Sequence, residues 1–147
     1  MSIEPATPAD REAVIALLAA QLEEHAIELA PTRLAAAVDG VFAVASRGVF
    51  LVARSGGRVV GVAYLSYTWA LEHGGQVGWL EELYVLPGER DRGIGGALLD
   101  AVCRQARSAG CAAIDLEVEG SHERAAHLYE RRGFRRLGRT RYSLGLA

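Results

Sequence analysis

The sequence has few of the residues that hold small secreted folds or metal sites together. Its only two cysteines are Cys103 and Cys111, too few for a disulfide framework and without zinc-site spacing. Both stand in apolar patterns, so we expect small core residues rather than reactive thiols. The four histidines form no ligand pattern, such as two on one helix face with an acidic partner, so we expect no metal site.

Long apolar runs and an excess of one charge are also missing. The longest apolar stretch near the start, residues 13–20, is about half of a membrane span, and residues 1–10 lack the basic region of a secretory signal. Sixteen Lys and Arg against 18 Asp and Glu give a formal net charge of −2, which provides no general attraction to nucleic acid or an anionic membrane. We therefore expect a cytoplasmic protein with neither partner.

The hydrophobic residues suffice for one packed core, because they make up half of the 147 residues. This length is typical of one domain. We predict a single domain over residues 1–147. The apolar spacing changes between helical and strand periods. It predicts strands at residues 3–6, 49–54, 58–69, 76–85, 111–118, 134–137 and 139–146, and helices at residues 8–24, 31–38, 93–108 and 121–132.

Turn and cap residues mark the borders of these elements. Thr7 is expected to cap the first helix, with Asp10 reaching back to it, and Ser121 to cap the last. Asp39 and Gly40 are expected to end the second helix. Short turns at residues 55–57 and 74–75 make the three middle strands an antiparallel meander. The order of elements predicts a mixed α/β (α+β) fold of about seven strands and four helices.

A glycine-rich turn enters the helix predicted at residues 93–108. Gly93, Gly95 and Gly96 occupy its first turn, where each glycine costs about 1 kcal/mol relative to alanine. Free amides and the helix dipole favour a phosphate there, and Arg90 or Arg92 can add positive charge. A tightly packed connection without a ligand is the alternative.

Two known phosphate motifs do not fit this turn. A dinucleotide fingerprint would require glycine at Leu98, and a P-loop would require lysine followed by serine or threonine after the last glycine. The pattern Arg-x-x-Gly-x-Gly therefore belongs to neither class, and by itself it is a weak signal.

Two motifs together resemble the GNAT superfamily of acetyl-CoA-dependent N-acetyltransferases. Arg90, Gly93 and Gly95 match its pyrophosphate signature, Arg/Gln-x-x-Gly-x-Gly/Ala. Residues 122–134 are similar to its later motif, Asn-x-x-Ala-x-x-Leu/Phe-Tyr-x-x-x-Gly-Phe, with His122 in place of the usual asparagine. The order of elements along nearly the whole chain also resembles the family.

This resemblance implies a GNAT fold, a mostly antiparallel sheet splayed in the middle, with acetyl-CoA as cosubstrate. The pantetheine arm would pair with the free edge of the strand ending at Val85, and an N–H near Val85 would polarise the thioester carbonyl. The amides of residues 91–96 would hold the pyrophosphate. The implied coenzyme-binding residues are Leu83, Tyr84, Val85, Arg90, Asp91, Arg92, Gly93, Ile94, Gly95, Gly96 and His122.

Direct attack by an amine requires its neutral form. An alkylamine with a pKa of about 10.4 is mostly protonated at pH 7, so a carboxylate or an ordered water must take the proton. Glu81 and Glu82 stand on the strand beside the acetyl site, and strand alternation points them to opposite faces. Glu81 matches the acidic residue of the Leu-Glu-Asp/Glu stretch in diamine and polyamine acetyltransferases, so we favour Glu81 as base. Glu82, a water, or an ordinary exposed carboxylate are the alternatives.

The later motif implies a catalytic acid. Tyr129 matches the family's tyrosine that protonates the departing thiolate, and a phenol with a pKa of about 10 can supply that proton. The alternative is a tyrosine of an amphipathic helix that packs on the sheet.

The resemblance leaves three functions open. The first is transfer of acetyl to a primary amine of a small molecule, such as a polyamine or amino acid. The second is acetylation of peptide or protein N-termini, because residues 116–118 and the Tyr129 motif also look like the ribosomal-protein N-terminal enzymes. The third is a non-catalytic acyl-CoA-binding sensor. Relatives are often homodimers, so a homodimer is also open.

Overall fold

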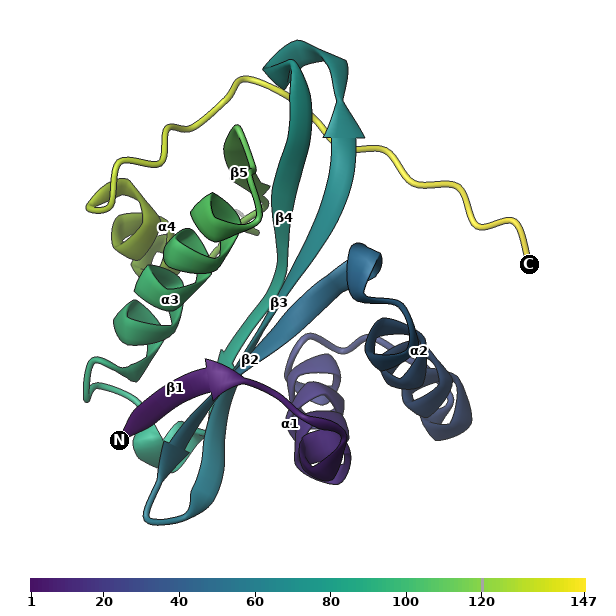
Figure 1. The fold of residues 1–147 in the computed structure, drawn as a ribbon, viewed down its shortest axis with the longest axis vertical. Coiled ribbons are helices and arrows are strands. Elements are labelled where there is room, and N and C mark those ends of the chain that lie inside the picture. Colours follow the sequence, from purple (N-terminus) through teal and green to yellow (C-terminus); the bar gives the residue numbers. More distant parts are fainter. Residues whose placement is uncertain (120) are drawn as a thin grey trace. The chain divides into compact units, whose positions relative to one another are not determined.

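The computed structural model describes residues 1–119 and 121–147, which form two compact units, Met1–Glu117 and Val118–Ala147. The first unit is built on one sheet whose strands lie in the order β1-β2-β3-β4-β5 (Figure 1). Neighbours from β1 to β4 run antiparallel, and β5 runs parallel to β4. The strands are β1 (Ser2–Pro5), β2 (Gly48–Ser55), β3 (Arg58–Ala70), β4 (Gly75–Val85) and β5 (Ala113–Leu116).

Helices cover both faces of this sheet. The pair α1 (Arg11–Glu24) and α2 (Pro31–Ala43) lies on one side, and α3 (Ile94–Ser108) lies on the other (Figure 1). The first side buries apolar residues of both helices, including Val14 and Val38, against Phe50, Val62 and Tyr84 of β2, β3 and β4. On the other side α3 contributes the buried residues Leu98, Leu99, Val102 and Ala106.

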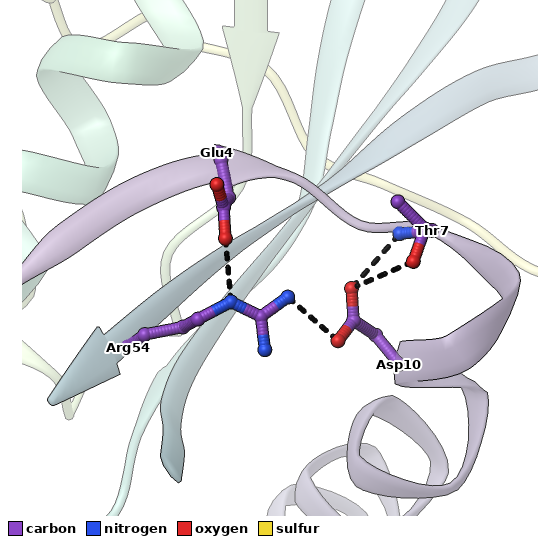
Figure 2. Close-up of polar contacts among 4 residues, drawn as sticks. All are labelled: Glu4, Thr7, Asp10 and Arg54. Carbon is purple, nitrogen blue, oxygen red and sulfur yellow. Dashed lines mark hydrogen bonds and ion pairs between the residues drawn. The ribbon is translucent and has the colours of Figure 1, made fainter. Parts of the chain in front are cut away.

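The start of α1 is fixed by the predicted cap. A 3-10 turn, Pro8–Asp10, precedes the helix, and Thr7 and Asp10 form a capping box. The Thr7 amide donates to Asp10 Oδ2 at 2.9 Å, and Arg54 Nη2 donates to Asp10 Oδ1 at 2.7 Å (Figure 2). Arg54 Nε also donates to Glu4 Oε1 at 2.5 Å. The Thr7 amide and the Arg54 guanidinium lower the pKa of Asp10, so this cluster joins β1, β2 and α1.

The second helix is longer than predicted. It runs to Ala43 instead of ending at residue 38. Asp39 pairs with Arg11 of α1, with Arg11 Nε donating to its Oδ1 at 2.6 Å and Nη2 to its Oδ2 at 3.0 Å. Val41 and Phe42 pack against the core beyond it. These contacts keep the chain helical through Asp39 and Gly40, which would otherwise favour a turn.

The second unit contains α4 (Glu123–Glu130) and no strand among its described residues. Its helix has His122 at the N-cap instead of the predicted Ser121, and Gly133 follows it with a left-handed φ of 92°. The strands predicted at residues 134–137 and 139–146 are wrong, so the described sheet has five strands instead of about seven. Tyr142, Leu144 and Leu146 are 82–92% exposed, and their alternation therefore has no buried face.

The fold class and the four helices agree with the prediction. The helix 121–132 is shorter than predicted, and the strand at 111–118 is reduced to β5. Among the described helices, none has both the length and the apolar character needed to cross a membrane.

Candidate active site

The pairing between β4 and β5 ends halfway along β4. Four pairs join β4 to β5, from Val77 with Ala113 to Leu80 with Leu116, where β5 ends. Residues 82–85 remain paired with β3 and have no partner from β5. A half-strand of this kind presents backbone N–H and C=O groups that can pair with an extended, amide-bearing ligand.

A β-bulge between β3 and β4 lies directly after the last residue of β4 that pairs with β5. Tyr64 of β3 pairs with Glu82 and the next residue, Leu65, pairs with Leu80, so Glu81 is the additional residue of β4. Tyr64 and Leu65 point to opposite faces of the sheet, and so do their partners. The simple alternation that we used to separate Glu81 from Glu82 is therefore wrong at this position, because a bulge inserts one residue into it.

The bulge places two carboxylates in unlike surroundings. Glu82 is half-buried and Glu81 is exposed. Burial, and then the charge of Glu81, raise the pKa of Glu82 to about 7. Burial and the same Glu81 charge also raise the pKa of Tyr64. A carboxylate that exchanges its proton near neutral pH has the property required of a general base.

The glycine-rich turn has the backbone conformation of a binding loop. Asp91 has a φ of 64° and Gly93 a φ of 78°, and the left-handed region is uncommon for a residue such as aspartate. The amide of Ala97 donates to Gly93 O at 3.0 Å. The amides of Ile94, Gly95 and Gly96 precede it and lie outside the repeating hydrogen bonds of α3. A Cβ on Gly93 would meet no atom within 4 Å, so the space beside this turn is open.

The two arginines of the turn have different partners. Arg90 Nε donates to Val85 O at 2.8 Å, and its Nη2 donates to the carboxylate of Glu24 at 3.0 and 3.1 Å. Its guanidinium carbon lies 5.3 Å from the ring centroid of Tyr84. Arg92 is more exposed and donates from Nη1 to Glu89 at 3.1 Å. The predicted phosphate ligand Arg90 thus has protein partners, which the signature alone does not indicate.

The strand residues named for coenzyme binding offer mainly their backbone. The side chain of Tyr84 is buried in the core beside α1 and α2, and Leu83 and Val85 are half-buried. The Val85 carbonyl already accepts from Arg90.

Tyr129 and His122 belong to the second unit. Tyr129 lies on α4 with its ring 5.8 Å from that of Phe134, edge to face, and burial raises the pKa of its hydroxyl. The carbonyl of His122 accepts from the Ala126 amide at 3.1 Å at the start of α4. The hydroxyl of Tyr129 therefore holds its proton at neutral pH, as an acid must before it donates.

A groove of about 640 Å³ lies between α1 and α2. Its lining is mostly apolar, including Leu22, Ile27 and Leu34, and it carries the carboxyl groups Glu23 and Glu28. Sequence reasoning did not find this groove, because it depends on how two helices and their connection pack.

One further cluster has metal-binding residue types. Glu72, His73 and Asp115 place ligand atoms within 4.8 Å of one another. His73 Nε2 lies 3.1 Å from Asp115 Oδ2, and this pair joins the β3–β4 turn to β5.

Comparison with known proteins agrees with this geometry. A family model described as "Acetyltransferase (GNAT) family" matches residues 17–134. An uncharacterized N-acetyltransferase of Mycobacterium bovis, Mb2688, is 30% identical over 142 residues, which cover 97% of this chain and 88% of the relative. A mycothiol acetyltransferase of Propionibacterium freudenreichii is 52% identical over 56 residues, which cover 36% of this chain but only 18% of that relative.

A solved structure is similar to this chain over nearly its whole length. The aminoglycoside N-acetyltransferase AAC(6')-Iy in complex with CoA has a TM-score of 0.84 and 19% identity, and the match covers 99% of this chain and 95% of that one. At this identity the likeness shows the fold alone. The family match over most of the length and the similarity to Mb2688 carry the assignment, and the chain belongs to the acetyltransferase (GNAT) family of N-acetyltransferases.

Proposed function

We propose that this enzyme transfers the acetyl group of acetyl-CoA to the primary amine of a small molecule by direct attack of the amine. The observation that carries the proposal is Glu82, a half-buried carboxylate with a pKa of about 7 on the free half of β4. A carboxylate with this pKa is ionised above neutral pH and can take a proton from an ammonium group, which a fully exposed carboxylate does less well.

The residues of the first unit fit a bound coenzyme. The free half of β4 offers backbone groups to the two amides of the pantetheine arm. The amides of Ile94, Gly95 and Gly96 lie at the positive end of α3 and suit a diphosphate. Solved neighbours contain CoA, AAC(6')-Iy among them. When bound, acetyl-CoA supplies an activated acyl group with a thiol as leaving group.

Four groups of the chain would then take separate roles in the acetyl transfer. Glu82 takes the proton of the amine, and the Val85 amide donates a hydrogen bond to the acyl oxygen. Tyr129 holds a proton at its hydroxyl for the leaving sulfur, and the raised pKa of that hydroxyl keeps it protonated until it is needed. Glu81 contributes through its charge, which raises the pKa of Glu82.

The groove between α1 and α2 supports a small-molecule acceptor. Glu23 and Glu28 place negative charge at a mostly apolar groove, a combination that suits an amine with an apolar part. Glu24 stands next to Glu23 and pairs with Arg90. This end of α1 therefore adjoins the glycine-rich turn at residues 90–96, which we call the coenzyme turn. Mycothiol acetyltransferase is named for a small molecule, which favours this class over peptides.

An acetyl-CoA consumption screen tests the proposal. The panel contains putrescine, spermidine, tyramine, tryptamine, glucosamine, free amino acids and short peptides with free N-termini. We expect turnover of at least one small amine and none of the peptides. Turnover restricted to peptides would instead support an N-terminal acetyltransferase, and coenzyme binding without any turnover would support a sensor.

Tyr129→Phe serves as the matched variant in this screen. It removes one hydroxyl and keeps the ring that contacts Phe134. We expect a lower kcat under conditions in which chemistry limits turnover. An unchanged kcat under those conditions would exclude the acid role of Tyr129.

A further inference from the structure

Arg90 connects the coenzyme turn to the end of α1. Its Nε donates to Val85 O at 2.8 Å, and its Nη2 contacts both carboxylate oxygens of Glu24, the last residue of α1. The planar guanidinium also lies over the ring of Tyr84 at 5.3 Å. One side chain thus holds the free half of β4 and the last turn of α1 at the same time.

Glu24 is suited to hold this contact at neutral pH. Hydrogen bonds from Tyr84 and from Arg90 lower the pKa of its carboxyl group, so Glu24 is charged. Tyr84 is itself fixed, because only 6% of it is exposed and its ring packs with α1 and α2. The three residues therefore form one connected cluster with a rigid tyrosine at its base.

The cluster adjoins the groove between α1 and α2. Leu22, Glu23 and Ala26 line that groove and flank Glu24 in the sequence. Ala26 has a left-handed φ of 53°, and such a conformation persists for a non-glycine residue only where the surroundings enforce it. A displacement of the backbone at Glu24 would therefore also displace Glu23 and Ala26, which line the groove.

We propose that Arg90 is a positioning residue that sets the acceptor groove from the coenzyme turn through Glu24, rather than a residue that serves only the pyrophosphate. This inference rests on the proposed function for the identity of the two ligands. The Arg90 guanidinium holds both the turn proposed to bind coenzyme and the end of α1 that borders the acceptor groove, so the two sites are coupled through it.

Three variants separate this role from a direct phosphate contact. Glu24→Gln removes the charge partner and leaves the turn intact. Arg90→Lys keeps the positive charge, but a lysine ammonium cannot reproduce the two-sided planar geometry of arginine. Asp39→Asn is the control, because it weakens a different ion pair of α1, the one with Arg11 at the start of the helix, whereas Glu24 is at its end.

Three readouts are measured on the whole 147-residue chain. Calorimetry with coenzyme A gives the affinity of the turn. Hydrogen exchange of the amides of residues 22–27 reports the stability of the end of α1 and needs no acceptor. Steady-state kinetics use the amine with the highest kcat/KM in the panel above.

For a positioning role we expect Glu24→Gln and Arg90→Lys to behave alike. Exchange at residues 22–27 should accelerate about fivefold, and the KM for the amine should rise about fivefold while kcat changes less than twofold. The Kd for coenzyme A should change less than threefold. The double variant should be no worse than either single one, and Asp39→Asn should leave the amine KM unchanged.

Two results would overturn the inference. One is normal amine KM and normal exchange in Glu24→Gln together with weak coenzyme binding in Arg90→Lys, which would make Arg90 a phosphate ligand only. The other is an equal rise in the amine KM in Asp39→Asn, which would reduce the effect to general loosening of α1. Failure of the wild-type protein to bind coenzyme A is a different outcome. It defeats the proposed function, while the exchange data still test whether the contact between Arg90 and Glu24 holds the end of α1.

Discussion

The two halves of β4 belong to one strand and have unlike surroundings. From Gly75 to Leu80 the strand pairs with β3, and from Val77 it also pairs with β5. Val77 and Leu80 there are at most 4% exposed. Beyond Leu80 the described pairs join the strand to β3 and not to β5. This half carries two carboxylates, Glu81 at the bulge and Glu82, which is half-buried and has a raised pKa. The same strand thus supports the fold in its first half and offers polar groups in its second half.

This contrast indicates where a small domain can place chemistry. A fully paired strand has no backbone group left for a ligand, and its side chains are committed to packing. A bulge ends that regularity at the cost of one unpaired residue. We therefore expect substitutions in the first half to reduce stability with little effect on turnover, and substitutions in or beside the second half to do the reverse.

The largest expected effect is at Glu82. Glu82→Gln removes the proposed base and should lower kcat/KM about 100-fold to 1000-fold at pH 8. In the wild-type enzyme, kcat/KM should rise with pH and level off above about 7, because Glu82 must be ionised. The measurement is a pH profile of steady-state acetylation.

Glu81→Gln is the matched control for this prediction. It should retain most of the rate and move the inflection to lower pH, because the like charge that helps to raise the pKa of Glu82 is gone. A larger loss of rate in Glu81→Gln than in Glu82→Gln would return the base to Glu81, as the sequence comparison favoured.

A second effect is expected at the turn that follows β4. Gly95→Val places a branched side chain at the first turn of α3, where a diphosphate would approach the backbone closely. Binding of coenzyme A should weaken about 30-fold, or about 2 kcal/mol, as measured by calorimetry. A folded variant with unchanged affinity would show that these amides do not hold the coenzyme.

A third effect concerns stability in the first half of β4. Val77 is 1% exposed and pairs with Ala113 of β5. Val77→Ala removes two buried methyl groups and should destabilise the fold by about 2 kcal/mol in denaturant unfolding. Its kcat/KM, measured well below the unfolding midpoint, should equal that of the wild type. A loss of rate comparable to that of Glu82→Gln would remove the distinction between the two halves.

The smallest effect is a gain of stability in Glu82→Gln. The folded pKa of Glu82, about 7, lies above the unfolded value of about 4.3. The folded state therefore binds this proton more tightly, and the wild-type protein loses stability as pH rises from about 4.5 to 7. The variant should be more stable than the wild type by about 1–2 kcal/mol at pH 8 and by less at pH 5. Equal stability at both pH values in urea unfolding would contradict the raised pKa.

Much of the fold could be read from local patterns. The meander of β2, β3 and β4 and the helices α1 and α3 lie within one or two residues of their predicted bounds, apart from the 3-10 turn that opens α1. Apolar spacing, the Thr7 cap and the turn glycines are short-range signals, and packing did not override them. The alternating pattern at residues 139–146 misled because alternation predicts a strand only where one face becomes buried.

The site was less readable than the fold. The segment Leu80-Glu81-Glu82-Leu83 is compatible with a regular strand and with a bulge, and only its pairing to Tyr64 and Leu65 distinguishes them. The contact of Arg90 with Glu24 joins residues 66 positions apart, for which no local spacing gives a signal. Asp91 in a left-handed conformation likewise follows no glycine pattern. The roles of Tyr129 and His122 stay predictions.

The half of β4 that has no partner from β5 also bears on how the protein behaves in concentrated solution. An open strand edge can accept a strand from another molecule, which is a common route to aggregation. Edge-to-edge docking of two copies there would bring the carboxylates of Glu81 and Glu82 close to those of the other copy, and their repulsion opposes such docking at alkaline pH. As Glu82 takes up its proton near pH 7, this repulsion weakens. We therefore expect the ligand-free enzyme to remain dispersed longer in storage at pH 8 than at pH 6.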